Sequence, residues 1–417
     1  MNKKILLGLL SVLLIPSFTA CSSDENKTTE EPTIEPTVDE KPSVKPTPEP
    51  TPTPEPTPTP TPTPSGDAVI KASSIKEAKK HCQEVESSYK EKVNKNKTIE
   101  LKGQVICDYA ISGNAHFMIF SDGKDILPIL VPANKVTLNK YRVGNYFTVK
   151  GNPASFRNQP CLSVMTNPVR NEDSTLDLAN MAKVGTIDEV YNKAYALEAV
   201  ENNNNIDCEL IKIKATYIAN VADNLMIVSD GTKPLILHGA DKINQTKKPG
   251  DIYDFYVMAS AFQGKRAAEV LEISKKIDTN TSYLEEIKAM AEVKTIAELS
   301  QVNRYNDNKK LYPHIFKVNA YIGANIIDGK HHLVFMDELD TQIKFDNKLD
   351  RPEVIYAKNK NHTIDDYNSQ YSKLTPYYLS DTKGEFYIVV TNYGSINHAF
   401  QAYVFDDLIE ELNIEAE

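Results

Sequence analysis

Basic and aromatic side chains are interleaved between residues 68 and 170 in a pattern that could bind a polyanion. The basic members are Lys102, Lys124, Lys140, Arg142, Lys150 and Arg157. The aromatic members are Tyr109, Phe117, Phe120, Tyr146, Phe147 and Phe156. Lysine and arginine neutralise phosphates and aromatic rings stack on bases, so this mixture is typical of a surface that holds a single-stranded nucleic acid.

A second interpretation explains the same residues without a ligand. Alternating phenylalanines are expected wherever a strand buries one side. Many of the lysines lie between Lys71 and Lys97, where we predict a helix whose lysines form a solvated face or meet anionic lipids and cell-wall polymers. Acidic neighbours would also repel a long polyanion. Nucleic acid is therefore a possible partner that the sequence does not favour.

The net charge distinguishes the first part of the chain from the rest. Residues 68–170 hold 16 Lys and Arg against 8 Asp and Glu, a balance of +8. Residues 171–290 have 13 against 19, or −6, and residues 291–417 have 13 against 20, or −7. Only the first part therefore predicts a basic surface.

Tyrosines gather in a long segment near the C-terminus. Between Ile343 and Phe386 lie 42 residues, whereas about 16 separate Ile129 from Tyr146. The segment includes Tyr356, Tyr367, Tyr371, Tyr377 and Tyr378. Tyrosine suits sugars or peptides because it has a broad apolar face and a polar tip, so Tyr377 and Tyr378 are candidate ligand contacts. The alternative is an insertion that packs its own tyrosines.

Four cysteines follow Cys21, namely Cys82, Cys107, Cys161 and Cys208. Outside the cytoplasm they could be oxidised. Cys107 ends the first predicted strand and Cys161 begins the last strand of the same unit, so these two form the candidate disulfide. The alternative is that all four are buried thiols.

Signals for catalysis are weak throughout the sequence. The eight histidines are scattered, and no HExxH, CxxC or GxSxG motif is present. Asp122 and Asp230 each precede a glycine, which suits turn formation better than acid–base chemistry. We therefore predict no enzyme activity, no cofactor and no metal site.

A repeated phrase organises the folded region. MIFSDG occupies residues 118–123 and MIVSDG occupies residues 226–231. Each Asp-Gly lies between runs of alternating apolar residues, which predicts a β-hairpin. A degraded third copy, LVFMDELDTQIKF, covers residues 333–345 and lacks the glycine.

Helix and strand signals recur with the hairpins. Ser74, Thr186 and Thr295 each begin an S/T-x-x-E capping box, and further strands follow at residues 143–151, 249–257 and 385–390. One unit thus contains a capped helix and five strands. The sequence predicts a mainly β fold of three tandem five-stranded OB-like Greek-key barrels, with domain limits 67–170, 171–290 and 291–417, the last carrying the tyrosine-rich insertion.

The order of a strand ending in VIC, then FMIFSDG, then VGNYFTVKG resembles OB-fold modules of bacterial surface lipoproteins and those beside some secreted nucleases. The resemblance covers all three units and is strongest in the first. It implies the fold and little chemistry, because OB-folds bind oligonucleotides, oligosaccharides or proteins.

The N-terminal residues predict targeting and display. Residues 1–20 have two lysines followed by an apolar run too short to span a bilayer, as in a signal peptide. Phe18-Thr19-Ala20-Cys21 resembles a bacterial lipobox, which implies lipidation of Cys21 and a membrane anchor. Residues 21–66 form a stalk rich in proline and threonine, where proline at alternate positions prevents helix and sheet formation.

Together these features predict a non-catalytic lipoprotein on the extracytoplasmic side of a membrane. Its three modules would bind a protein or an envelope polymer. The alternatives are single-stranded nucleic-acid capture by the first unit and polysaccharide binding by the insertion of the third.

Overall fold

The computed structural model describes residues 69–112, 115–132, 143–167, 169–170, 176–198, 206–222, 224–239, 247–260, 267–300, 315–327, 330–339, 355–357, 373–392 and 401–412. The predicted signal peptide, Cys21, the predicted stalk and Arg142 lie outside these residues. The described residues belong to one compact unit. No helix within the described ranges is long and apolar enough to cross a membrane.

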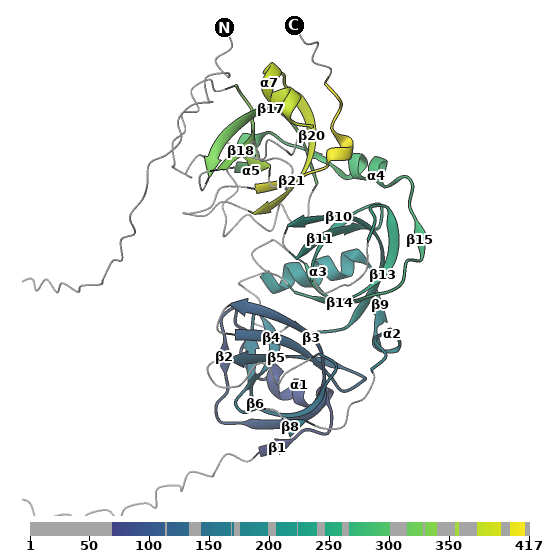
Figure 1. The fold of residues 1–417 in the computed structure, drawn as a ribbon. Helices are drawn as coiled ribbons and strands as arrows, with labels where there is room; N and C mark the ends of the chain where they lie inside the picture. The colour runs from purple at the N-terminus through teal and green to yellow at the C-terminus, as the bar shows by residue number, and fades with distance from the viewer. Residues whose placement is uncertain are drawn as a thin grey trace, which may run out of the picture. The chain divides into compact units, whose positions relative to one another are not determined.

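The first sheet closes on itself (Figure 1). Its order is β1-β3-β4-β5-β7-β6-β2, with β8 beside β6, and β3 also pairs with β6. Strands β3 to β7 therefore form a closed barrel, which we call barrel 1. The strands are β1 (Val69–Lys71), β2 (Lys92–Val93), β3 (Thr98–Ser112), β4 (Ala115–Ser121), β5 (Ile126–Pro132), β6 (Tyr146–Phe156), β7 (Gln159–Val164) and β8 (Val169–Arg170).

The second sheet repeats this arrangement in the order β15-β13-β14-β12-β11-β10-β9, and β13 also pairs with β10. Strands β10 to β14 form barrel 2. The strands are β9 (Lys183–Val184), β10 (Ile211–Ala222), β11 (Leu225–Ser229), β12 (Pro234–His238), β13 (Asp251–Ala259), β14 (Ala268–Ile273) and β15 (Asp278–Thr279).

The third sheet has the order β16-β17-β18-β19-β21-β20, and β17 also pairs with β20. Strands β17 to β21 form barrel 3. The strands are β16 (Glu292–Val293), β17 (Phe316–Ile327), β18 (Lys330–Met336), β19 (Ile355–Ala357), β20 (Gly384–Asn392) and β21 (Gln401–Val404).

Each barrel has the connectivity of an OB-fold. With the barrel strands numbered along the chain, the order is 1-2-3-5-4, and strand 1 pairs back with strand 4. This Greek-key closure confirms the mainly β class and the OB-like barrel. The domain limits drawn from the sequence stay predictions.

Short helices accompany the barrels. They are α1 (Ile75–Gln83), α2 (Leu178–Met181), α3 (Ile187–Glu198), α4 (Tyr283–Met290), α5 (Ile296–Ser300), α7 (Thr375–Ser380) and the 3₁₀ turn η4 (Asp406–Leu408). The helix predicted between Lys71 and Lys97 is thus wrong in extent. Lys71 lies in β1 before the Ser74 cap, Lys92 lies in β2, and α1 ends at Gln83.

The predicted caps start three of these helices. Ser74 accepts a hydrogen bond from the amide of Glu77 at 3.2 Å. Thr186 accepts from Glu189, and Thr295 accepts from Glu298, each at 3.1 Å. These contacts satisfy amide donors that the first helical turn leaves open.

The repeated SDG phrase joins a hairpin to a helix. Gly123 has φ +89°, which allows the tight turn between β4 and β5. One oxygen of Asp122 accepts the amides of Lys124 and Asp125 at 3.0 Å. The other oxygen accepts the amide of Ile75, at the start of α1, at 2.8 Å. The aspartate is therefore a structural residue, as its position in the turn predicts.

The predicted third hairpin differs from the first two. β18 pairs with β19, whose first residue is Ile355, instead of with residues that directly follow the turn. Residues 340–345 of the predicted hairpin lie outside the described residues. Glu338 and Leu339 stand where the other copies have a glycine with positive φ, so the sequence lacks the residue that closes the tight turn.

Candidate binding surfaces

Three lysines surround one glutamate on the outside of barrel 1. Lys71 in β1 is opposite Glu100 in β3, and Glu100 is opposite Lys150 in β6. Lys102 lies two residues along β3, on the same side of the strand. The three lysines are exposed and Glu100 is half-buried. We call Lys71, Glu100, Lys102 and Lys150 the lysine face.

The charges of the lysine face act on one another. Lys150 Nζ lies 3.0 Å from a carboxylate oxygen of Glu100. The hydrogen bond from Lys150 lowers the pKa of Glu100 against a smaller opposing effect of desolvation, and the charges of Lys150, Lys71 and Lys102 lower it further. Glu100 therefore stays ionised at neutral pH. Three lysines against one glutamate leave the face positive.

The strand register places equivalent rows of residues on all three barrels. The rows are Lys71–Glu100–Lys150, Val184–Lys212–Tyr256 and Val293–Lys317–Tyr387. Barrel 1 thus has lysine where the other two barrels have tyrosine. It also has lysine where they have valine.

The tyrosines of the other two rows are docked against a neighbouring barrel. Tyr256 is 6% exposed and packs in the apolar core cluster of barrel 1, together with Met258. Tyr387 is 7% exposed and packs with Ile227 and Ile236 of barrel 2. The same barrel face is therefore a docking surface twice, whereas its counterpart in barrel 1 carries exposed charge.

The strand face that OB-folds commonly use for ligands is occupied in barrel 1. OB-folds bind oligonucleotides on strands 2 and 3, which are β4 and β5 here. Residues Phe117, Met118, Ile119 and Phe120 of β4 are all fully buried, so neither side of the strand is open. These phenylalanines are core residues, as the second interpretation of the sequence expects.

Two further residues of the predicted basic and aromatic surface are also packed inside. Arg157 is only 6% exposed and has φ +51° in the β6–β7 turn. Its guanidinium carbon lies 5.2 Å from the centre of the Phe156 ring. That ring packs edge-on against Phe117 at 5.6 Å. The turn thus buries Arg157, where the sequence predicts an exposed ligand contact.

The structure brings together only part of the predicted basic set. Lys102 and Lys150 share the lysine face, whereas Lys124 is exposed in the β4–β5 turn. Arg142 lies outside the described residues. Lys71 and Glu100 also belong to this surface, although neither is among the residues predicted from the sequence. The signal that could have found Glu100 is its alternation with Lys102 along one strand.

The candidate tyrosines of barrel 3 have structural roles. Tyr377 is 5% exposed, its hydroxyl donates to the carbonyl of Glu410 at 2.8 Å, and its ring packs against Phe386 at 5.1 Å. It therefore belongs to the core and is not a ligand contact. Tyr378 is half-buried against the same core, and burial raises the pKa of its hydroxyl.

The predicted pairing of Cys107 with Cys161 is wrong, because all four described cysteines are buried thiols without a disulfide. β3 and β7 are not neighbours in the sheet. Cys107 Sγ lies 3.8 Å from the carbonyl oxygen of Val270 in barrel 2. Cys161 instead lies within barrel 1, and burial raises the pKa of its thiol.

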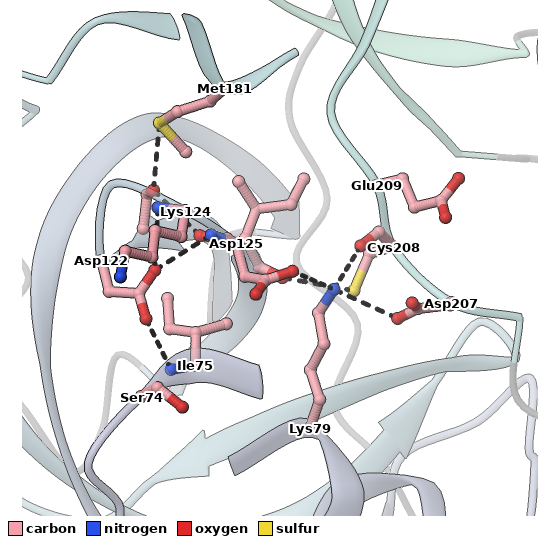
Figure 2. Close-up of polar contacts among 12 residues, drawn as sticks. Ser74, Ile75, Lys79, Asp122, Lys124, Asp125, Met181, Asp207, Cys208 and Glu209 are labelled. Atoms are coloured by element: carbon pink, nitrogen blue, oxygen red, sulfur yellow. Dashed lines mark hydrogen bonds and ion pairs between the residues drawn. The ribbon is translucent and has the colours of Figure 1, made fainter. Parts of the chain in front are cut away.

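A buried lysine joins barrel 1 to the segment that leads into barrel 2 (Figure 2). Lys79 of α1 is 6% exposed, and its Nζ donates to the carbonyl of Cys208 at 2.6 Å. Its ammonium also lies 3.2 Å from Asp207 and 3.8 Å from Asp125. This contact was not predicted from the sequence. The available signal was a lysine at the fourth position after Ile75, on the apolar side of the helix.

The charge state of Lys79 argues for a structural role. Burial acts to lower its pKa, but the interactions with Cys208 and with the carboxylates of Asp207 and Asp125 outweigh burial, so the pKa lies above the usual value. A lysine nucleophile needs a lowered pKa. Lys79 thus stays an ammonium at neutral pH and holds the two segments together.

Among the described residues, no group of His, Cys, Asp and Glu side chains is placed to hold a metal ion.

No protein-family model and no curated protein matches the chain. Among solved structures, it is similar to the S. pombe Stn1–Ten1 complex at 18% identity and a TM-score of 0.16, covering 18% of this chain and 59% of that one. It is also similar to a replication protein A heterotrimer bound to single-stranded DNA, at 11% identity and a TM-score of 0.24, covering 75% of this chain and 93% of that one. A third similar structure is the Ifi202 HINa domain with 20-base-pair double-stranded DNA. Its sequence identity is 10% and its TM-score is 0.22, and the match covers 43% of this chain and 96% of that one. The chain spans less than two thirds of the first of these. At such identities and scores, the similarities do not bear on what this chain binds.

Proposed function

We propose that this chain is a non-catalytic binding protein, anchored through lipid on Cys21 to the extracytoplasmic side of a bacterial membrane, that binds a component of the cell envelope. The lipobox-like Phe18-Thr19-Ala20-Cys21 supports the anchor. The proline-rich stalk would act as a spacer, because polyproline II is extended at about 3.1 Å per residue.

The exposed lysine face is the observation that carries the binding role. The equivalent faces of barrels 2 and 3 are used to dock neighbouring barrels through Tyr256 and Tyr387. The face of barrel 1 that β4 and β5 form is buried as well. The lysine face is thus a charged surface that the packing of the barrels leaves open to a partner.

The chemistry of the buried polar groups supports a role without catalysis. Asp122 is occupied in a turn and at a helix start. Burial raises the pKa of the Cys82 and Cys208 thiols to about 12, so they stay protonated and weakly nucleophilic at neutral pH. Lys79 stays charged and links helix α1 to Asp207 and Cys208.

The anchor and the binding role are tested separately. Cells that express the wild-type chain should incorporate labelled palmitate into it, and a Cys21→Ala variant should not. The unlipidated Cys21→Ala chain should still sediment with isolated envelopes. A variant that is labelled without Cys21 would refute the anchor. An unlipidated chain that stays wholly in the supernatant would refute envelope binding.

A further inference from the structure

The lysine face distributes its charge over three neighbouring strands. Adjacent strands lie about 4.8 Å apart, so the Lys71 and Lys150 positions are separated by about 10 Å across Glu100. Lys102 lies about 7 Å from Glu100 along β3. These separations suit an extended ligand with several charges better than a single small anion. A polymer with closely spaced charges could contact all three lysines.

The residues of this face differ from those that dock protein in the same fold. Barrels 2 and 3 dock through buried Tyr256 and Tyr387. At protein interfaces, tyrosine is enriched and lysine is depleted, because lysine loses strong hydration and side-chain freedom on burial. With Lys150 in place of the tyrosine, the row in barrel 1 favours a ligand that leaves the ammonium groups partly hydrated.

The aromatic residues of barrel 1 offer little for base stacking. Phe117, Phe120 and Phe147 are at most 2% exposed. Phe156 packs against Phe117. Proteins that hold single-stranded nucleic acids combine basic grooves with exposed aromatic rings. Among the described tyrosines of this region, Tyr146 is half-buried and Tyr89 is 40% exposed. The lysine face thus combines its charge with few exposed rings, so recognition through bases is not favoured.

From this geometry we propose that the lysine face binds a linear phosphate-bearing polymer through its charges alone. The inference deepens the proposed function, because it names the class of envelope component that the first barrel binds. Lysine acts as a point charge toward phosphate and needs no fixed bidentate geometry. Binding is therefore weakly selective for the backbone of the polymer and strongly dependent on salt.

The test uses the full chain with Cys21→Ala and inorganic polyphosphate as the probe. If two to three phosphates are neutralised, the logarithm of the association constant should fall with the logarithm of salt with a slope of about −1.4 to −2.7. The triple variant Lys71→Gln, Lys102→Gln, Lys150→Gln should bind at least about tenfold more weakly at low salt. The matched control is Lys76→Gln, Lys90→Gln, Lys95→Gln, which removes three exposed lysines of the same region and should bind like the parent.

A gain-of-binding variant excludes misfolding as the explanation. Glu100→Gln removes the one carboxylate among the three lysines and releases Lys150 from its 3.0 Å ion pair. This variant should bind polyphosphate several-fold more tightly, with a steeper salt dependence. Unchanged or weaker binding by Glu100→Gln would contradict the assignment.

Two further probes separate the ligand classes. Oligo(dT) with the same number of phosphates should bind no more tightly than polyphosphate, and poly-L-glutamate should bind more weakly. Much tighter oligo(dT) binding would overturn the inference in favour of nucleic acid. Equal binding of poly-L-glutamate would overturn it in favour of an acidic protein, for which exposed Met165 and Val169 could supply apolar contacts.

The envelope assay shows which proposal has failed. If the parent chain sediments with envelopes and the triple glutamine variant does so equally, the phosphate inference fails and the proposed function stands. If the parent binds neither envelopes nor polyphosphate, both fail.

Discussion

Replacement of Lys79 by methionine should weaken the junction between barrel 1 and barrel 2. The ammonium donates a 2.6 Å hydrogen bond to the carbonyl of Cys208, and a charged hydrogen bond of this kind contributes about 1.5–3 kcal/mol. The ion pairs with Asp207 and Asp125 add little, about 0–1 kcal/mol each, because these carboxylates are 42% and 36% exposed. Methionine recovers the desolvation cost of the buried ammonium and keeps most of the length of the lysine side chain. We therefore expect a net loss of about 2 kcal/mol in the free energy of unfolding.

The assay is urea unfolding of the Cys21→Ala chain, combined with amide hydrogen exchange. The local probe is the amide of Ile206, which donates to the carbonyl of Asn158 at 3.0 Å and so reports on the same junction. Its protection should fall in Lys79→Met. The control is Lys76→Met, an exposed lysine of α1, for which we expect a change within about 0.5 kcal/mol.

Equal unfolding midpoints for Lys79→Met and Lys76→Met, with unchanged protection of Ile206, would refute this reasoning. That result would mean that burial of the ammonium costs as much as its contacts contribute. If both variants lose stability, the effect would come from helix α1 itself and not from the junction.

Three further predictions concern the interior of the first two barrels. Gly103→Ala should destabilise the chain by about 1–3 kcal/mol in thermal or urea unfolding, because the added carbon would lie 2.6 Å from the carbonyl oxygen of Ser121; wild-type stability would contradict the close approach. Asp122→Ala should lower the free energy of unfolding by about 2 kcal/mol and expose the Ile75 amide to exchange. Asp122→Asn should lower it less, because the asparagine keeps an acceptor for the turn. Burial raises the pKa of the Cys208 thiol to about 12. The protonated thiol therefore stabilises the folded state fully below the unfolded pKa of about 8.5. This stabilisation is lost as the pH rises toward 12, by about 1.4 kcal/mol per pH unit. Cys208→Ala should flatten this alkaline decline in unfolding measured from pH 8 to 11, and parallel profiles would show that the thiol is not its source.

Local patterns in the sequence were enough to predict the first two hairpins and the helix starts, and the recurrence of five strands in each unit predicted the OB-like barrel. Asp-Gly between alternating apolar residues specifies a hairpin because glycine alone adopts the required positive φ without strain, as Gly123 and Gly231 do. The hydroxyls of Ser74 and Thr295 start helices through contacts only three residues away. Such features depend on neighbours in sequence, so they can be read from the sequence alone.

Tertiary structure alone decided which side chains remain on the surface. Alternation places a residue on one of two strand faces, but it does not show which face another barrel covers. Tyr256 and Lys150 occupy equivalent positions in the strand pattern, yet Tyr256 is docked and Lys150 is exposed. Arg157 is buried in the β6–β7 turn and Tyr377 is buried in the core of barrel 3, so their burial also depends on tertiary packing. The lysine face joins Lys71 to a residue of β6 through strand pairing across the closed barrel. Contacts of this kind depend on long-range register and packing, which no local pattern encodes.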